Sequence, residues 1–201
     1  MYEYVNCGGV KDNIKTEINY MLRCHALPVA RRVVKLPWNE EKLTVLSVAP
    51  LEIFASKTVA LLTRTAPRDL YDMYNMVKYG LFDESEEAML RKCAVFYSAI
   101  GAERPPEKFE LDNVGNVSKQ QIKRDLAPVL RKGERFDLEM AQKKTCEYLA
   151  SVLAPTEEEE LFWKAFTEGK YCPELIFGAT AEYVNVEKHP MALWKCRGKG
   201  E

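Results

Sequence analysis

The sequence predicts an α+β fold in which a small sheet comes first and helices make up most of the rest. Apolar and polar residues alternate singly within the first 48 residues, which is the period of half-buried strands. From Pro50 onward the apolar residues recur at helical spacing. In the second half, Ser118-Lys-Gln-Gln121 and Thr156-Glu-Glu-Glu159 both have the pattern of a capping box at a helix start.

The strands are expected in three short segments. The clearest alternation runs over residues 13–22, and shorter β patterns lie at 33–36 and 43–48. Residues 37–39 between these two indicate a turn, as do Cys7-Gly-Gly9 ahead of the first strand.

Six helices are expected, three on each side of a connection. Pro50 and Pro67 occupy the first helical positions of two of them, and Gly80 is a stop signal. The expected ranges are 50–64, 67–80, 84–100, 119–131, 136–152 and 157–168. The chain thereby divides into a first unit (1–100, with strands over about 2–48 and helices over about 50–100), a connection rich in Gly, Pro and charge (101–117), and a helical C-terminal subdomain (118–201).

Composition excludes several classes of protein. Of the 201 residues, 47% are hydrophobic, which rules out intrinsic disorder. The net charge of -1 argues against a generic nucleic-acid coat protein. No apolar run approaches the ~20 residues that a bilayer requires, and the first residues lack the pattern of a signal peptide, so we expect a cytoplasmic protein without a membrane partner.

Cysteine and histidine spacing gives no metal or disulfide signal. The six cysteines contain no C-x-x-C pair, which predicts reduced, mostly buried thiols. His25 and His189 stand far apart, and neither is expected to be catalytic.

Three groups of charged residues could carry chemistry. Lys15 and Glu17 share the non-core face of a predicted strand, where the alternative is a solvent-facing ion pair. Lys57 and Arg64 lie two turns apart on one helix face, where Lys57 either snorkels to water or points at an anion.

The third group follows at the start of the next helix. Asp69 and Asp72 share a face at i, i+3, and Arg68 is expected to reach Asp72 at i, i+4. With Lys57 and Arg64 these residues form a dense charge network, for which the alternative is a structural brace between two helices.

These residues also carry a resemblance to a known family. The segment Glu52-Ile-Phe-Ala-Ser-Lys57-Thr-Val-Ala-Leu-Leu-Thr-Arg64, followed by Arg68-Asp69-Leu-Tyr71-Asp72, resembles the signature of the AbiEii/AbiGii toxin family of nucleotidyltransferases, in the polymerase-beta-like superfamily. Residues 14–20 resemble the preceding strand of the family. Residues 171–177 with His189-Pro190 resemble its C-terminal tail.

The resemblance implies transfer of a nucleotidyl group from a magnesium-bound nucleoside triphosphate (NTP) to an acceptor such as RNA, in a toxin-antitoxin or abortive-infection setting with a cognate antitoxin. It implies that Glu17 is a metal ligand and that Lys57 neutralises triphosphate charge. Asp69 and Asp72 would orient Lys57 or accept a proton. The remaining cations, Lys15, Arg64 and Arg68, would contribute to NTP binding.

One part of the family pattern is missing. Members carry a Gly-Gly-Ser/Thr turn and a Ser-x-Asp-x-Asp strand that supply the two principal metal ligands, and Cys7-Gly-Gly9-Val is followed by neither. The sheet therefore resembles a partial nucleotidyltransferase sheet with its N-terminal part absent. We expect the isolated chain to be inactive.

Two alternatives to a self-sufficient enzyme follow. Between residues 119 and 135, six Lys or Arg residues against two acidic ones predict a basic face that could bind RNA without catalysis, or an ordinary solvated helix face. A sheet edge left uncovered near residues 2–22 would instead pair with a separate N-terminal half or with another copy of the chain.

Overall fold

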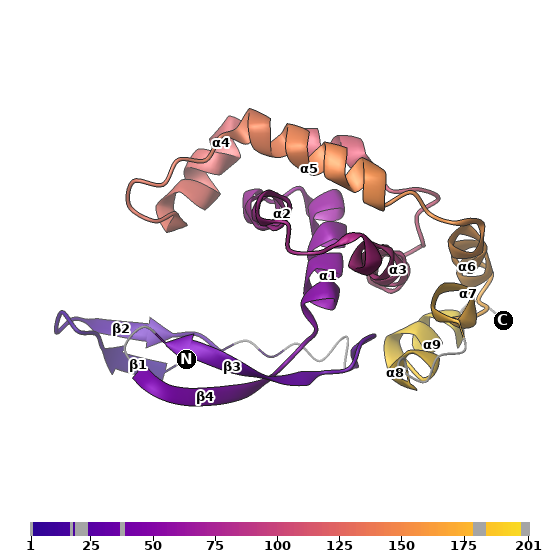
Figure 1. The fold of residues 1–201 in the computed structure, drawn as a ribbon, viewed down its shortest axis with the longest axis horizontal. Coiled ribbons are helices and arrows are strands. Elements are labelled where there is room, and N and C mark those ends of the chain that lie inside the picture. Colours follow the sequence, from indigo (N-terminus) through magenta and orange to yellow (C-terminus); the bar gives the residue numbers. More distant parts are fainter. Residues whose placement is uncertain (1, 17, 19–23, 37–38, 179–183, 198–201) are drawn as a thin grey trace.

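The computed structural model describes residues 2–16, 18, 24–36, 39–178 and 184–197, and it has the α+β architecture that the sequence predicts. Two antiparallel ribbons of two strands each lie beside a larger body of helices (Figure 1). Helix α1 (Pro50–Arg64) begins three residues after the last strand and leads from the ribbons into this body.

The first ribbon pairs β1 (Tyr2–Val5) with β2 (Lys11–Ile14). The predicted turn at Cys7–Gly9 is confirmed, and Gly9 takes a φ of 77° that suits glycine. The strand predicted for 13–22 is wrong in extent, because β2 ends at Ile14. Since Tyr2, the first residue of β1, pairs with Ile14, the ladder has no partner beyond that point. Of the remaining residues, 17 and 19–22 lie outside the described part.

The second ribbon pairs β3 (Ala30–Leu36) with β4 (Asn39–Ser47) and confirms the two shorter predicted strands. The described side chains of this ribbon are mostly exposed, and those of the first ribbon are all exposed. Neither ribbon covers a core of its own, and a two-stranded ribbon by itself is only marginally stable. Their orientation must therefore come from the points where they join the helices.

The long helices agree with the sequence to within a few residues. They are α1 (Pro50–Arg64), α2 (Pro67–Tyr79), α3 (Glu84–Gly101), α5 (Leu138–Val152) and α6 (Glu157–Thr167). Prolines begin α1 and α2, and Gly80 ends α2 in the left-handed conformation. Both predicted capping boxes, at Ser118 and Thr156, are present. Shorter helices close the chain: α7 (Glu174–Phe177), α8 (Val184–Glu187) and α9 (Pro190–Arg197).

The helix predicted for 119–131 is wrong as a single element. The chain there divides into α4 (Lys119–Gln121), a π-helical turn η2 (Ile122–Leu126) and a 3₁₀ turn η3 (Ala127–Val129). Pro128 has no N–H to continue an α-helical ladder, so the hydrogen-bond pattern changes as the chain approaches it. The connection predicted for 101–117 contains one further 3₁₀ element, η1 (Leu111–Asn116).

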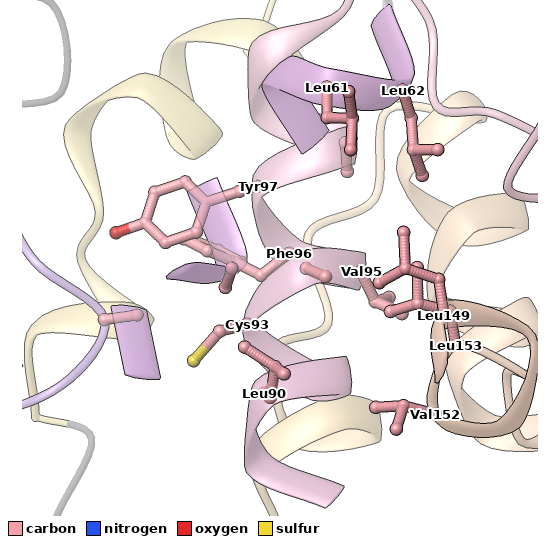
Figure 2. Close-up of a cluster of buried hydrophobic side chains, with 14 of the residues drawn as sticks. Leu61, Leu62, Leu90, Cys93, Val95, Phe96, Tyr97, Leu149, Val152 and Leu153 are labelled. Atoms are coloured by element: carbon pink, nitrogen blue, oxygen red, sulfur yellow. The ribbon is translucent and has the colours of Figure 1, made fainter. Parts of the chain in front are cut away.

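Helix α3 is the centre of the core. Every side chain from Cys93 to Ile100 is buried, and α3 contacts α1, α5, α6, α7 and α9. Figure 2 shows Val95 on the same side of α3 as Leu149, Val152 and Leu153, whereas Cys93 and Tyr97 lie on the other side. The second side faces α1 and the chain segment that precedes β3.

All six thiols are free, as expected, but the prediction that most are buried is wrong. Cys93 is buried, Cys7 is exposed and the other four are intermediate, because they lie on connections and helix faces at the edge of the core. Within the described ranges, no helix is both long and apolar enough to span a bilayer.

Candidate functional site

The corner between α1 and α2 brings the predicted charged residues together. Only Thr65 and Ala66 separate the two helices, and Thr65 closes α1 in the left-handed conformation with a φ of 50°. This tight corner folds α2 back against α1, and the two helices pack together. Four side chains on their facing sides form what we term the α1–α2 charged site: Lys57, Arg64, Asp69 and Asp72.

Lys57 and Asp72 form the accessible half of this site. The Lys57 Nζ donates to Asp72 Oδ2 at 2.5 Å. Both side chains are about one third exposed, at 35% for Lys57 and 37% for Asp72. An ammonium has three donors, so Asp72 fixes its direction while leaving donors free to meet an anion.

Arg64 and Asp69 form the second half, in which the carboxylate is buried and the arginine side chain is exposed. The guanidinium donates through Nε and Nη2 to the two Asp69 oxygens at 2.7 and 2.8 Å, a bidentate pair. Asp69 is only 3% exposed and lies in the first turn of α2, where the helix dipole favours a carboxylate. The hydrogen bond that Arg64 donates to Asp69 raises the pKa of Arg64. Asp69 thus holds Arg64 and closes the corner, and its predicted contact with Lys57 is replaced by that of Asp72.

Arg68 does not make the predicted i, i+4 contact with Asp72. Its Nε donates to the backbone carbonyl of Asp125 at 3.1 Å, inside the π-helical turn η2. The Asp72 carboxylate is already engaged by Lys57, and a π turn leaves carbonyls available for outside donors. Arg68 therefore ties α2 to the segment that follows α4.

Tyr71 makes a second tie between α2 and that segment. Its hydroxyl donates to Glu134 Oε1 at 2.7 Å, and this bond raises the pKa of Tyr71 and lowers the pKa of Glu134. The outward side of α2 is thereby braced by residues 122–134, which leaves the α1-facing side to form the charged site.

The remaining predicted site residues lie on the N-terminal part of the chain. Lys15 is exposed and directly follows β2, whereas Glu17 lies outside the described residues. No group of three or more His, Cys, Asp or Glu side chains that could hold a metal occurs in the part of the chain that is described. Asp69 and Asp72 each already face a cation, so the described residues do not fit a magnesium site.

Comparison with known families gives one match. The family model described as nucleotidyl transferase AbiEii toxin, of a type IV toxin-antitoxin system, matches residues 2–153. The chain belongs to the AbiEii family. The match takes in both ribbons, the charged site of this AbiEii protein and α5, and it ends before α6. The tail resemblance at 171–177 and 189–190 is outside it. Neither the curated proteins nor the solved structures contain a significant match.

Sequence reasoning missed a buried polar cluster beside the charged site. Glu52, in the first turn of α1, is 2% exposed and accepts hydrogen bonds from the backbone N–H groups of Ala26 and Leu27, both at 3.0 Å. His25 Nδ1 lies 3.0 Å from its Oε1, and the Tyr97 hydroxyl donates to the same oxygen. The available signal was a single carboxylate inside the apolar run 45–55, because a buried carboxylate requires donors.

Proposed function

We propose that this AbiEii-family chain takes part in the transfer of a nucleotidyl group from an NTP to an acceptor hydroxyl such as that of RNA, and that it supplies the residues that position the triphosphate. The observation that carries the proposal is the Lys57–Asp72 pair. The carboxylate holds the ammonium in one direction, yet a third of the Lys57 side chain remains accessible.

The charged site suits the requirements of this reaction. The acceptor oxygen forms a bond to the α-phosphorus, the bond from that phosphorus to the β-phosphate oxygen breaks, and pyrophosphate leaves. The catalytic contribution of the protein is mainly position and charge neutralisation. Lys57 would neutralise the triphosphate, with Arg64, Arg68 and Lys15 as further cations. Asp72, the more exposed carboxylate, would orient Lys57 or take the proton of the acceptor hydroxyl, and Asp69 would hold Arg64.

We further propose that the isolated chain binds NTP without completing the transfer. The printed sequence contains no Asp-x-Asp, and the described residues do not form a magnesium site. Glu17 stays the candidate metal ligand of this chain. Magnesium chemistry would then need further carboxylates in addition to Glu17.

Nucleotide titration tests the proposal. We expect Lys57→Ala to weaken NTP binding in a calorimetric titration by about tenfold, the effect of losing one charge-assisted hydrogen bond. The matched control is Lys170→Ala, since Lys170 also forms an ion pair, with Glu168 at 3.1 Å, but far along the chain in the connection between α6 and α7. Equal binding by wild type and Lys57→Ala would contradict the assignment of Lys57.

A second candidate function is RNA binding by the basic segment 119–135. The six cationic side chains of this segment are exposed. Two of them are partly neutralised, Lys119 by Glu139 and Arg124 by Asp125. The others are Lys123, Arg131, Lys132 and Arg135. Because phosphate binding releases counterions, affinity for RNA through this face should fall steeply as salt rises. Salt-independent RNA binding would contradict it.

The partners proposed are a cognate antitoxin and a polypeptide that pairs with the ribbons. The family description names a type IV toxin-antitoxin system. The ribbons expose apolar side chains that include Tyr2, Tyr4, Ile14 and Leu46. If an open strand edge drives self-association, light scattering should show dimers that Tyr4→Lys disperses, and a strictly monomeric wild type would contradict this.

A further inference from the structure

We propose that Glu52 is a positioning residue that sets the orientation of the β3–β4 ribbon relative to the α1–α2 charged site. The evidence is the buried cluster in which one carboxylate meets four donors: the amides of Ala26 and Leu27, the His25 ring and the Tyr97 hydroxyl. Three of these contacts meet Oε1 and the Leu27 amide meets Oε2, so both carboxylate oxygens are engaged.

The segment that Glu52 holds has no secondary structure of its own. Ala26 and Leu27 are buried, although they belong to neither a strand nor a helix. Buried backbone N–H groups need acceptors, and here the acceptors come from a side chain on α1. Removing the carboxylate would leave two buried amides unpaired, so the segment would have to detach from the core.

The β3–β4 ribbon is attached to the helices at two points, and this segment is one of them. The other attachment is covalent, since β4 continues into α1 through Val48 and Ala49. The Cys24–Leu27 segment leads into β3, which begins at Ala30, and Glu52 at the start of α1 holds it by hydrogen bonds. A ribbon fixed at both strand ends has a defined direction, whereas a ribbon fixed at one end can swing about it.

The residue that holds this segment lies on the same helix as the charged site. Glu52 lies on α1 only five positions before Lys57. Holding residues 24–27 against the first turn of α1 therefore sets the direction in which the β3–β4 ribbon leaves, relative to the ammonium of Lys57. The consequence for nucleotide binding rests on the proposed function, whereas the positioning itself does not.

The C-terminal helices complete the cluster from outside the family-matched region. His189, one residue before α9, is fully buried, and its ring lies 5.2 Å from that of Phe96 in an edge-to-face contact. Neither ring nitrogen of His189 has a hydrogen-bond partner. This ring fills space beside α3, while the Glu52 carboxylate accepts from the Ala26 and Leu27 amides.

Hydrogen exchange tests the proposal without requiring any activity. We expect Glu52→Gln to lower the protection of the Ala26 and Leu27 amides, and of the β3–β4 ladder, by about tenfold more than that of α5, because its NH₂ group cannot accept from a backbone N–H. The matched control is Glu159→Gln, a carboxylate that is also buried and held by Arg91 and by the Thr156 amide. It should leave the ribbon amides at their wild-type protection relative to α5.

Two further measurements keep the result decisive. If Glu52→Gln fails to fold, Tyr97→Phe removes one donor while keeping the ring and should show a smaller loss at the same amides. Probes placed at exposed Leu46 and Tyr79 as non-natural amino acids should report a broader distance distribution in the Glu52 variant. Unchanged protection at residues 26 and 27, or an unchanged distribution, would overturn the proposal. A wild type that binds no NTP would instead overturn the proposed function and leave the Glu52 result standing.

Discussion

The two ion pairs of the α1–α2 charged site should separate stability from nucleotide binding. Removing the partner of a fully buried charge costs about 3–5 kcal/mol, because the remaining charge is unpaired. Arg64 is 66% exposed and water can replace part of its contact, so we expect Arg64→Ala to lower the free energy of unfolding by about 2 kcal/mol. For a chain of this size, that corresponds to a fall in melting temperature of about 4–8 °C.

Lys57→Ala should have a much smaller effect on stability. Lys57 and Asp72 are both about one third exposed, and exposed pairs contribute about 0–1 kcal/mol. The expected fall in melting temperature is below about 4 °C. The variant that weakens NTP binding is thus expected to leave the fold nearly unchanged, and its loss of binding can be assigned to the missing ammonium.

Thermal unfolding followed by circular dichroism measures both effects. A double-mutant cycle then measures the interaction energy between Arg64 and Asp69. Arg64→Ala combined with Asp69→Ala leaves no unpaired charge, so the double variant should be more stable than the sum of the single effects by about 1 kcal/mol or more. Additive single effects would show that the bidentate bond contributes nothing, and equal losses for Arg64→Ala and Lys57→Ala would refute the argument from burial.

Three other predictions follow from single residues. Thr65→Gly should raise the melting temperature by about 2–4 °C because it relieves a β-branched residue at a φ of 50°, whereas Thr63→Gly inside α1 should lower it. Trp163→Phe should lower the free energy of unfolding by about 1–3 kcal/mol, since its buried indole N–H donates to two oxygens of α3, while Trp194→Phe, at an exposed position, should not change it. Burial lowers the pKa of His189 in the folded protein. As the pH falls below about 6.5, the unfolded chain therefore binds a proton that the folded chain does not, which destabilises the folded state. The free energy of unfolding, measured from pH 7.5 to 5, should thus decrease less in His189→Leu than in wild type.

The sequence determined most of the helices because their ends carry local signals. Pro50, Pro67 and Gly80 act within one or two residues of their own positions, and the capping boxes at Ser118 and Thr156 span three. The prediction of one helix over 119–131 was wrong because Pro128 interrupts the α-helical hydrogen-bond ladder after α4. It was also wrong for β2, because strand length is set by the partner strand.

The candidate site was predicted in its membership but not in its pairing. Periodicity placed Lys57 and Arg64 on one face of α1 and Asp69 and Asp72 on one face of α2. Which cation meets which carboxylate depends on how the corner at Thr65 turns α2. Arg68 shows the limit most clearly, since its partner is a backbone carbonyl 57 positions later.

By itself, the sequence determined the α+β class, the boundaries of the long helices to within a few residues, and the residues that relate this chain to the AbiEii family, because these depend on patterns within a few neighbouring positions. Only the tertiary structure decided that Asp69 is buried and Asp72 accessible, and that Glu52 joins residues 24–27 to α1 and α3. Burial and long-range hydrogen bonds are properties of packed surfaces, and those surfaces exist only once the segments have met.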